Sequence, residues 1–84
     1  MLVPLTSLKE GESGIIASIN TNPRGRGAGR GFQKRLMDMG LTPGTKITVI
    51  KSAPFRGPIE VYVRGSRLAL GRGMAARIFV EINK

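Results

Sequence analysis

The side chains of this 84-residue chain that could do chemistry are mostly basic. It has 14 lysines and arginines, five acidic residues, and neither cysteine nor histidine. Nucleophilic catalysis, acid–base catalysis and tight transition-metal sites usually depend on thiolate or imidazole groups. The acidic residues are scattered along the sequence: Glu10, Glu12, Asp38, Glu60 and Glu81. We therefore expect no enzyme activity, no metal site within one chain and no cofactor.

Arginine is concentrated in residues 20–31, NTNPRGRGAGRG, which contain four glycines and one proline. This composition leaves little to bury and predicts a flexible loop. Arg24, Arg26 and Arg30 are candidate contacts for a polyanion such as a nucleic-acid backbone. Because no aromatic residue is interleaved with them to stack on bases, a simple connecting loop is the favoured interpretation. The glycine spacing matches neither a P-loop nor a dinucleotide-binding motif.

The net charge of +9 favours an acidic neighbour, which would be nucleic acid, an anionic membrane surface or an acidic protein face. An excess of arginine that serves only solubility explains the charge equally well. No apolar run approaches the roughly 18–20 residues that span a bilayer. The first residues do not resemble a secretory signal. These features together predict a cytoplasmic location.

The clearest local pattern is a short helix at about residues 31–39. Three apolar residues spaced i, i+4 and i+7 give this helix one apolar face: Phe32, Leu36 and Met39. Gly40 stands where a left-handed residue caps a helix, and Leu41 can fold back against the last turn. Pro43 and Gly44 then predict a tight turn into a strand.

Five segments of alternating apolar residues predict short β-strands at 13–20, 45–51, 59–64, 67–70 and 78–82. Ile50 breaks the alternation of its strand, which indicates a bulge or burial on both faces. Residues 52–58 form a hairpin-like connection, Gly65-Ser66 turns the chain, and residues 71–76 form a short loop or helical turn. Five strands with one inserted helix predict a mainly β fold, a small SH3-like β-barrel, as a single domain over residues 1–84.

Two ordered stretches resemble a known family. RLMDMGLTPGTKITVI at 35–50 and APFRGPIEVYVRGSRLAL at 53–70 are similar to the ferrous iron transport protein A (FeoA) family, and the resemblance extends over about residues 4–82. The sequence departs from the family pattern at Ser66, where an aromatic residue is frequent. It departs again at 71–77, GRGMAAR, which replaces a segment that usually contains glutamates.

The resemblance implies an SH3-like barrel with a helical insertion. It also implies a cytoplasmic accessory of ferrous iron transport protein B, a membrane permease with a GTP-binding domain, which the small protein binds to modulate Fe(II) uptake. Family members are related to a domain of metal-dependent repressors, so a regulatory role is an alternative.

The predicted partner-binding residues lie on two surfaces, an exposed helix face and a set of aromatic side chains: Lys34, Arg35 and Asp38, and Phe55, Tyr62 and Phe79. Tyr62 and Phe79 are out of phase with the main apolar rows of their strands, so they can line a groove for an extended segment. Phe79 in a second core layer is an equal alternative. Exposed edge strands and Phe55 leave self-association open.

Two further functions remain as alternatives. The net charge and the arginine-rich loop suit a small nucleic-acid-binding barrel, for which the absence of aromatic stacking pairs is unfavourable. An arginine of the loop could also act as an arginine finger on the GTP-binding domain of a partner. We consider both less favoured than the partner-binding function.

Overall fold

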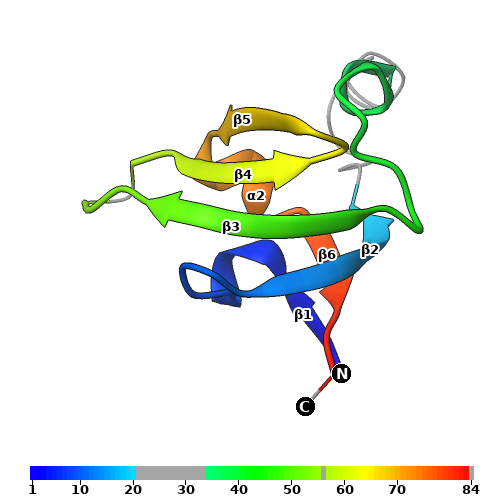
Figure 1. The fold of residues 1–84 in the computed structure, drawn as a ribbon, viewed down its shortest axis with the longest axis horizontal. Helices are drawn as coiled ribbons and strands as arrows, with labels where there is room; N and C mark the ends of the chain where they lie inside the picture. The colour runs from blue at the N-terminus through cyan, green and yellow to red at the C-terminus, as the bar shows by residue number, and fades with distance from the viewer. Residues whose placement is uncertain (21–33, 56, 84) are drawn as a thin grey trace.

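A computed structural model describes residues 1–20, 34–55 and 57–83 of the chain (Figure 1). Its labelled elements, in chain order, are β1 (Leu2–Pro4), the 3-10 helix η1 (Leu5–Ser7), β2 (Ser13–Ile19), β3 (Lys46–Ser52), β4 (Ile59–Val63), β5 (Ser66–Leu70), α2 (Arg72–Ala75) and β6 (Ile78–Glu81). Residues 34–38 are also helical. The fold is mainly β, as the sequence predicts.

The six strands form one antiparallel sheet in the order β1-β6-β2-β3-β4-β5. The sheet curls on itself as a small barrel (Figure 1). Two register shifts help it to bend, one in β2 between Ile16 and Ser18 and one in β3 between Val49 and Lys51. The second shift leaves Ile50 as the extra residue, so the predicted bulge in this strand is confirmed.

The core is made by the inward-facing residues of the strands. Ile47, Val49, Val61 and Val63 are each at most 1% exposed, and they alternate with residues that are exposed or half-buried. Apolar alternation with a period of two is therefore what places one face of each strand in the core. Leu36 from the helical residues and Leu41 just after them close this core and are also 0% exposed.

The strand β1 is the main element that the sequence does not predict. Leu2–Pro4 pairs with β6 through Leu2↔Glu81 and Val3↔Val80, and a three-residue strand is too short to carry a recognisable alternation. Met1 extends the pairing through two backbone bonds with Ile82 (2.9 and 3.1 Å), and its amino group also lies 2.7 Å from Glu81 Oε1. The barrel thus has one more strand than the five predicted.

Other predicted elements lie where expected, with small shifts. Residues 72–75 form α2, which confirms a helical turn within 71–76. The β4–β5 turn is centred on Arg64 and Gly65, both at positive φ, one residue earlier than predicted. The helix is confirmed over 34–38. Its expected start at 31–33, and residues 21–31 of the loop with Arg24, Arg26 and Arg30, lie outside the described residues.

Candidate functional site

The helical residues 34–38 end in a hydrogen-bonded cap. Gly40 has φ +83°, its N–H donates to Met37 O at 2.9 Å, and the N–H of Leu41 donates to Leu36 O at 2.8 Å. These two bonds define a Schellman motif, in which the residue after the glycine packs against the last turn. Because Leu36 and Leu41 are both fully buried, the cap fixes Met37 on the outer side.

A tight turn joins this cap to β3 and binds it to β2. The N–H of Thr45 donates to Thr42 O at 3.1 Å, with Pro43 and Gly44 (φ +91°) in the central positions. This is the sequence that a type II turn favours. Gly44 N–H donates to Ile16 O at 2.7 Å, and Ile16 N–H donates to Thr45 O at 2.9 Å. The turn therefore lies directly against Ile16, in the middle of β2.

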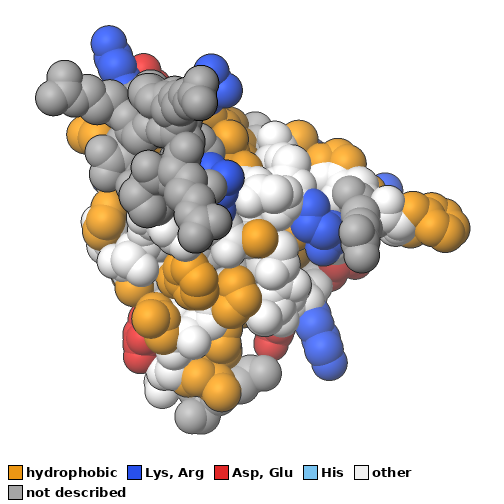
Figure 2. Space-filling view, turned by 180° about the vertical axis from the view of Figure 1, so that it is seen from behind, with side chains coloured by type: hydrophobic (Ala, Val, Ile, Leu, Met, Phe, Trp, Pro, Cys, Tyr) orange, Lys and Arg blue, Asp and Glu red, His pale blue; other side chains and the backbone are white. Residues whose placement is uncertain are grey.

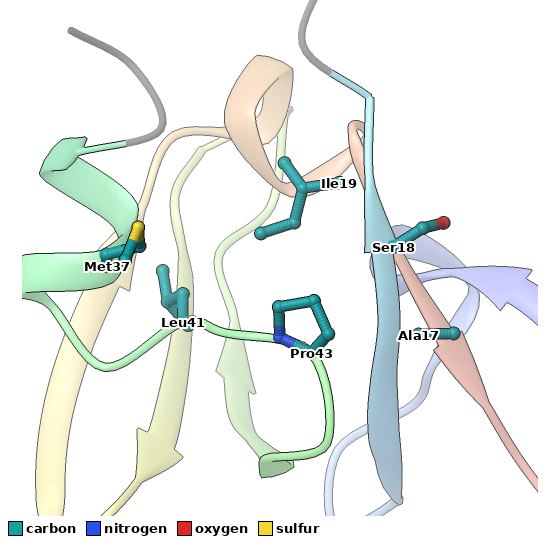
Figure 3. A pocket seen from close by; sticks show the side chains of 6 residues that line it. All are labelled: Ala17, Ser18, Ile19, Met37, Leu41 and Pro43. Atoms are coloured by element: carbon teal, nitrogen blue, oxygen red, sulfur yellow. The ribbon is translucent and has the colours of Figure 1, made fainter. Parts of the chain in front are cut away.

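Between the cap, the turn and the end of β2 lies a pocket of about 350 Å³. We call it the β2 pocket, and it is lined by Ala17, Ser18, Ile19, Met37, Leu41 and Pro43. Figure 3 shows Ile19 on β2 facing Leu41 and Pro43, with Met37 beyond Leu41 on the helix side. Five of the six lining residues are apolar and none carries a titratable group. Such a pocket can receive an apolar side chain, and among its six described lining residues the Ser18 hydroxyl has no acidic or basic neighbour that could activate it.

An arginine from the β4–β5 turn holds the two sides of this region together. Arg64 Nη2 lies 3.3 Å from Thr45 Oγ1 and 3.5 Å from Thr42 Oγ1. The two threonine hydroxyls lie 3.0 Å apart. The stem of Arg64 also covers Gly40, where a Cβ atom would lie 3.0 Å from Arg64 Cδ. This arginine therefore fastens the cap and the turn to β4 and β5.

Sequence reasoning predicts the cap and the Pro-Gly turn but misses both the β2 pocket and the role of Arg64. The cap and the turn are local signals of a few adjacent residues. The pocket instead joins residues 17–19 to 37–43, and Arg64 lies 22 residues from Thr42. No spacing rule connects positions that only the barrel brings together.

The predicted helix face lies beside the β2 pocket. Lys34, Arg35 and Asp38 are all exposed, and they share their short helix with Met37, which lines the pocket and is 63% exposed. The structure thus carries charged groups of both signs on the helix that also supplies Met37 to the pocket.

The predicted aromatic residues are not brought together. Tyr62 lies on β4 and is 47% exposed, whereas Phe79 lies on β6 and is half-buried opposite Ser18 and Pro4. The strands β2 and β3 lie between β4 and β6 in the sheet. The two rings therefore do not lie on neighbouring strands, and any contact that each makes with a partner has to be considered separately.

Phe55 lies at the other end of β3, in the connection to β4. It is 99% exposed and has φ +56°, a conformation that a bulky residue rarely adopts. This connection projects from the body of the molecule, with hydrophobic side chains at its extremity at the right of Figure 2. Arg72 of α2 supports its base through bonds to Ser52 Oγ (3.1 Å) and Ala53 O (3.3 Å).

The acidic side chains do not gather into a metal centre. Within 1–20, 34–55 and 57–83, no three His, Cys, Asp or Glu side chains are grouped so that they could hold a metal ion. No helix in these ranges is long and apolar enough to cross a membrane. The basic side chains visible on the back of the molecule are spread over its surface and do not form one patch (Figure 2).

Comparison with known proteins places the chain in a family. The FeoA domain model matches residues 3–82. A protein of Methanocaldococcus jannaschii with the name "Putative Fe(2+) transport protein A" is 39% identical over 80 residues, which are 95% of this chain and 87% of that protein. A Porphyromonas gingivalis protein that fuses Fe(2+) transport protein A to the Fe(2+) transporter FeoB is 35% identical over 78 residues. The match covers 93% of this chain but only 8% of the fusion protein.

Solved structures agree with this match. The crystal structure of an iron uptake regulatory protein (FeoA) has a TM-score of 0.77 and 38% identity, with 96% of each chain covered. FeoA of Stenotrophomonas maltophilia, described as a procaryotic SH3 domain protein and complexed with zinc, has a TM-score of 0.76 at 22% identity, over 94% of this chain and 89% of that one. The second likeness concerns the fold alone, and it agrees with the SH3-like barrel. This chain belongs to the FeoA domain family of ferrous iron transport.

Proposed function

We propose that the chain is a non-catalytic accessory protein of ferrous iron uptake that binds the permease, ferrous iron transport protein B, and modulates Fe(II) transport. The observation that carries this proposal is the β2 pocket, which is apolar and lacks titratable groups. A pocket of this kind suits the recognition of an apolar side chain and does not suit catalysis. The fusion of the two proteins in P. gingivalis supports the choice of partner.

The proposed contact surface has an apolar centre and a charged rim, as protein–protein interfaces commonly do. The centre is the β2 pocket, where the unbranched side chain of Met37 can adapt to the group that enters. The rim is the helix face of Lys34, Arg35 and Asp38, all of them exposed. Because two of these three residues are basic, the matching face of the permease should be acidic.

The proposed site of action is the inner face of the membrane, against the GTP-binding domain of the permease. In a fusion protein the two domains meet at a high effective concentration, so a weak contact is enough. Without such a linkage, the surface of the domain would have to provide the same encounter. The net charge of +9 would then increase the rate of association with an acidic partner.

Binding to the full-length, detergent-solubilised permease tests the pocket. We expect Met37→Glu to weaken binding at least about tenfold, because a charge would then lie in an apolar contact. The matched control is Ile15→Glu, since Ile15 is an exposed apolar residue on β2 (43% exposed, against 63% for Met37) that does not line the β2 pocket. Wild-type chain that does not bind the permease would overturn the choice of partner. Equal losses of affinity in both variants would indicate that the permease does not bind at the pocket.

Charge changes of opposite sign test the rim. The double substitution of Lys34→Glu with Arg35→Glu should weaken binding several-fold, whereas Asp38→Lys on the same face should strengthen it. Both effects should shrink as salt is raised, because exposed charges are screened beyond about 8 Å at 0.15 M ionic strength. If both variants changed binding in the same direction, an acidic partner face would be excluded.

A further inference from the structure

The strand β5 has a free edge. Among the residues that the structure describes, it is the last strand of the sheet and pairs only with β4, in the register Val63↔Ser66, Tyr62↔Arg67 and Val61↔Leu68. A two-residue turn at Arg64 and Gly65 closes this hairpin, so Val63 and Ser66 form a hydrogen-bonded pair and every second pair after it does the same. The residues between them, Arg67 and Ala69, therefore direct their N–H and C=O groups away from β4.

Nothing in the described ranges covers this edge. Over residues 1–20, 34–55 and 57–83, no backbone hydrogen bond reaches Arg67 or Ala69 from the outer side, and both residues are exposed. The strand contains neither proline nor a register shift, which are two of the devices that keep sheet edges from pairing.

The opposite edge of the sheet differs. There β1 has only three residues and ends at Pro4, so it offers few groups to another strand. Met1 and Ile82 form a hydrogen-bonded pair of the antiparallel ladder, with the Ile82 N–H donating to Met1 O at 2.9 Å. Leu2 is consequently the residue of β1 whose N–H points outward.

The outward groups of β5 match a second copy of the same strand. If two copies run antiparallel with Leu68 opposite Leu68, Arg67 of each lies opposite Ala69 of the other, and four N–H···O=C bonds can form. No two like charges lie directly opposite each other. Glu60 Oε1 already lies 3.5 Å from Arg67 Nε within each copy, which offsets the charge that would otherwise repel the second strand.

We propose that two copies of this chain associate by antiparallel pairing of their β5 strands, so that one sheet continues across the dimer. This goes beyond the proposed function, because β5 lines no part of the β2 pocket. Pairing over five residues buries less than the roughly 1,200 Å² of a standard interface, so the dimer should be reversible and favoured at high concentration. Each copy carries a charge of +9, so added salt should strengthen the dimer by screening their repulsion.

Sedimentation equilibrium on the full chain, at low and high salt, measures this association. Ala69→Pro removes one outward N–H and leaves the bonds to β4 in place, and we expect it to raise the dissociation constant about tenfold or more. Ala69→Val keeps the N–H and should keep the dimer. A chain that stays monomeric at millimolar concentration, or a dimer that Ala69→Pro leaves intact, would overturn the proposal. An association that weakens with salt would also overturn it, since that indicates attraction between opposite charges and not backbone pairing of two copies that each carry a charge of +9.

Amide hydrogen exchange on the wild-type chain gives an independent test, which does not depend on how Ala69→Pro folds. Protection of the Arg67 and Ala69 amides should rise with protein concentration, whereas protection of the outward Leu2 amide of β1 should not. Equal behaviour of the two edges would overturn the proposal. The β2 pocket variant Met37→Glu should leave this self-association unchanged, so failure of the dimer and failure of permease binding can be told apart.

Discussion

The two ends of β3 are built differently. At its start, the cap and the Thr42–Thr45 turn are held by backbone bonds to β2 and by Arg64, which reaches both threonine hydroxyls. At its end, the connection to β4 carries Phe55 fully in solvent and at a positive φ. At the first end Leu36 and Leu41 are fully buried and Met37 is partly covered (63% exposed), whereas at the second end Phe55 is 99% exposed.

The two ends of β3 therefore offer a partner different things, a fixed pocket at the start and an exposed aromatic ring at the end. The start of β3 has the packing and hydrogen bonds that keep a pocket in one form, which lowers the ordering cost of binding. The Phe55 end gains nothing for the core from its aromatic ring, so folding does not explain why a large apolar residue stands there. Substitutions can alter one end at a time. The stability of each variant can then be compared with that of a variant at the other end or at a neighbouring residue.

The largest expected effect is at the cap. Leu36→Ala removes a fully buried side chain that packs in the core, and we expect a loss of about 2–4 kcal/mol in the free energy of unfolding. Urea denaturation followed by circular dichroism measures it. The control is the next residue, Met37→Ala, which is 63% exposed and should change stability by less than about 0.5 kcal/mol. Similar losses in both variants would contradict the packing described for the cap.

A smaller effect is expected from the glycines of the same end. Gly40→Ala should cost about 1–2 kcal/mol, because the residue keeps φ +83° and its Cβ would lie 3.0 Å from Arg64 Cδ. Gly44 has a similar φ of +91°, but a Cβ added there would meet no atom of the described residues within 4 Å. Gly44→Ala therefore isolates the cost of the dihedral angle alone. Thermal unfolding of both variants measures the difference. A greater loss for Gly44→Ala would contradict the contact with Arg64.

The smallest effect on stability is expected at the far end. Phe55→Gly should leave the free energy of unfolding unchanged or raise it by up to about 0.5 kcal/mol, since glycine adopts φ +56° without strain. If Phe55 contacts the permease, as the sequence predicts, the same variant should bind it more weakly. A clear loss of stability would mean that this ring packs in the folded protein, and the contrast between the two ends of β3 would fail.

Local signals account for most of what the sequence predicts correctly. Gly40 and the Pro43-Gly44 pair specify their own backbone conformations, and alternation specifies the inward face of each strand. The β2 pocket and the Arg64 contacts could not be predicted, because they depend on pairings between segments far apart in the sequence. The edges of the sheet could not be predicted either. Whether residues 66–70 form an edge strand or an inner strand depends on the order of all six strands, not on these residues alone.

The position of β6 has a consequence for how the chain acquires its structure. This strand lies between β1 and β2, and its Glu81 pairs with both Leu2 and Ile15. During synthesis, β1 and β2 therefore lack this neighbouring strand until residues 78–81 have been made. The hairpins of β3, β4 and β5 can form earlier because their partners are close in sequence, but barrel closure is a late event. Nascent chains that stop before β6 should therefore be recognised by chaperones, not released as folded domains.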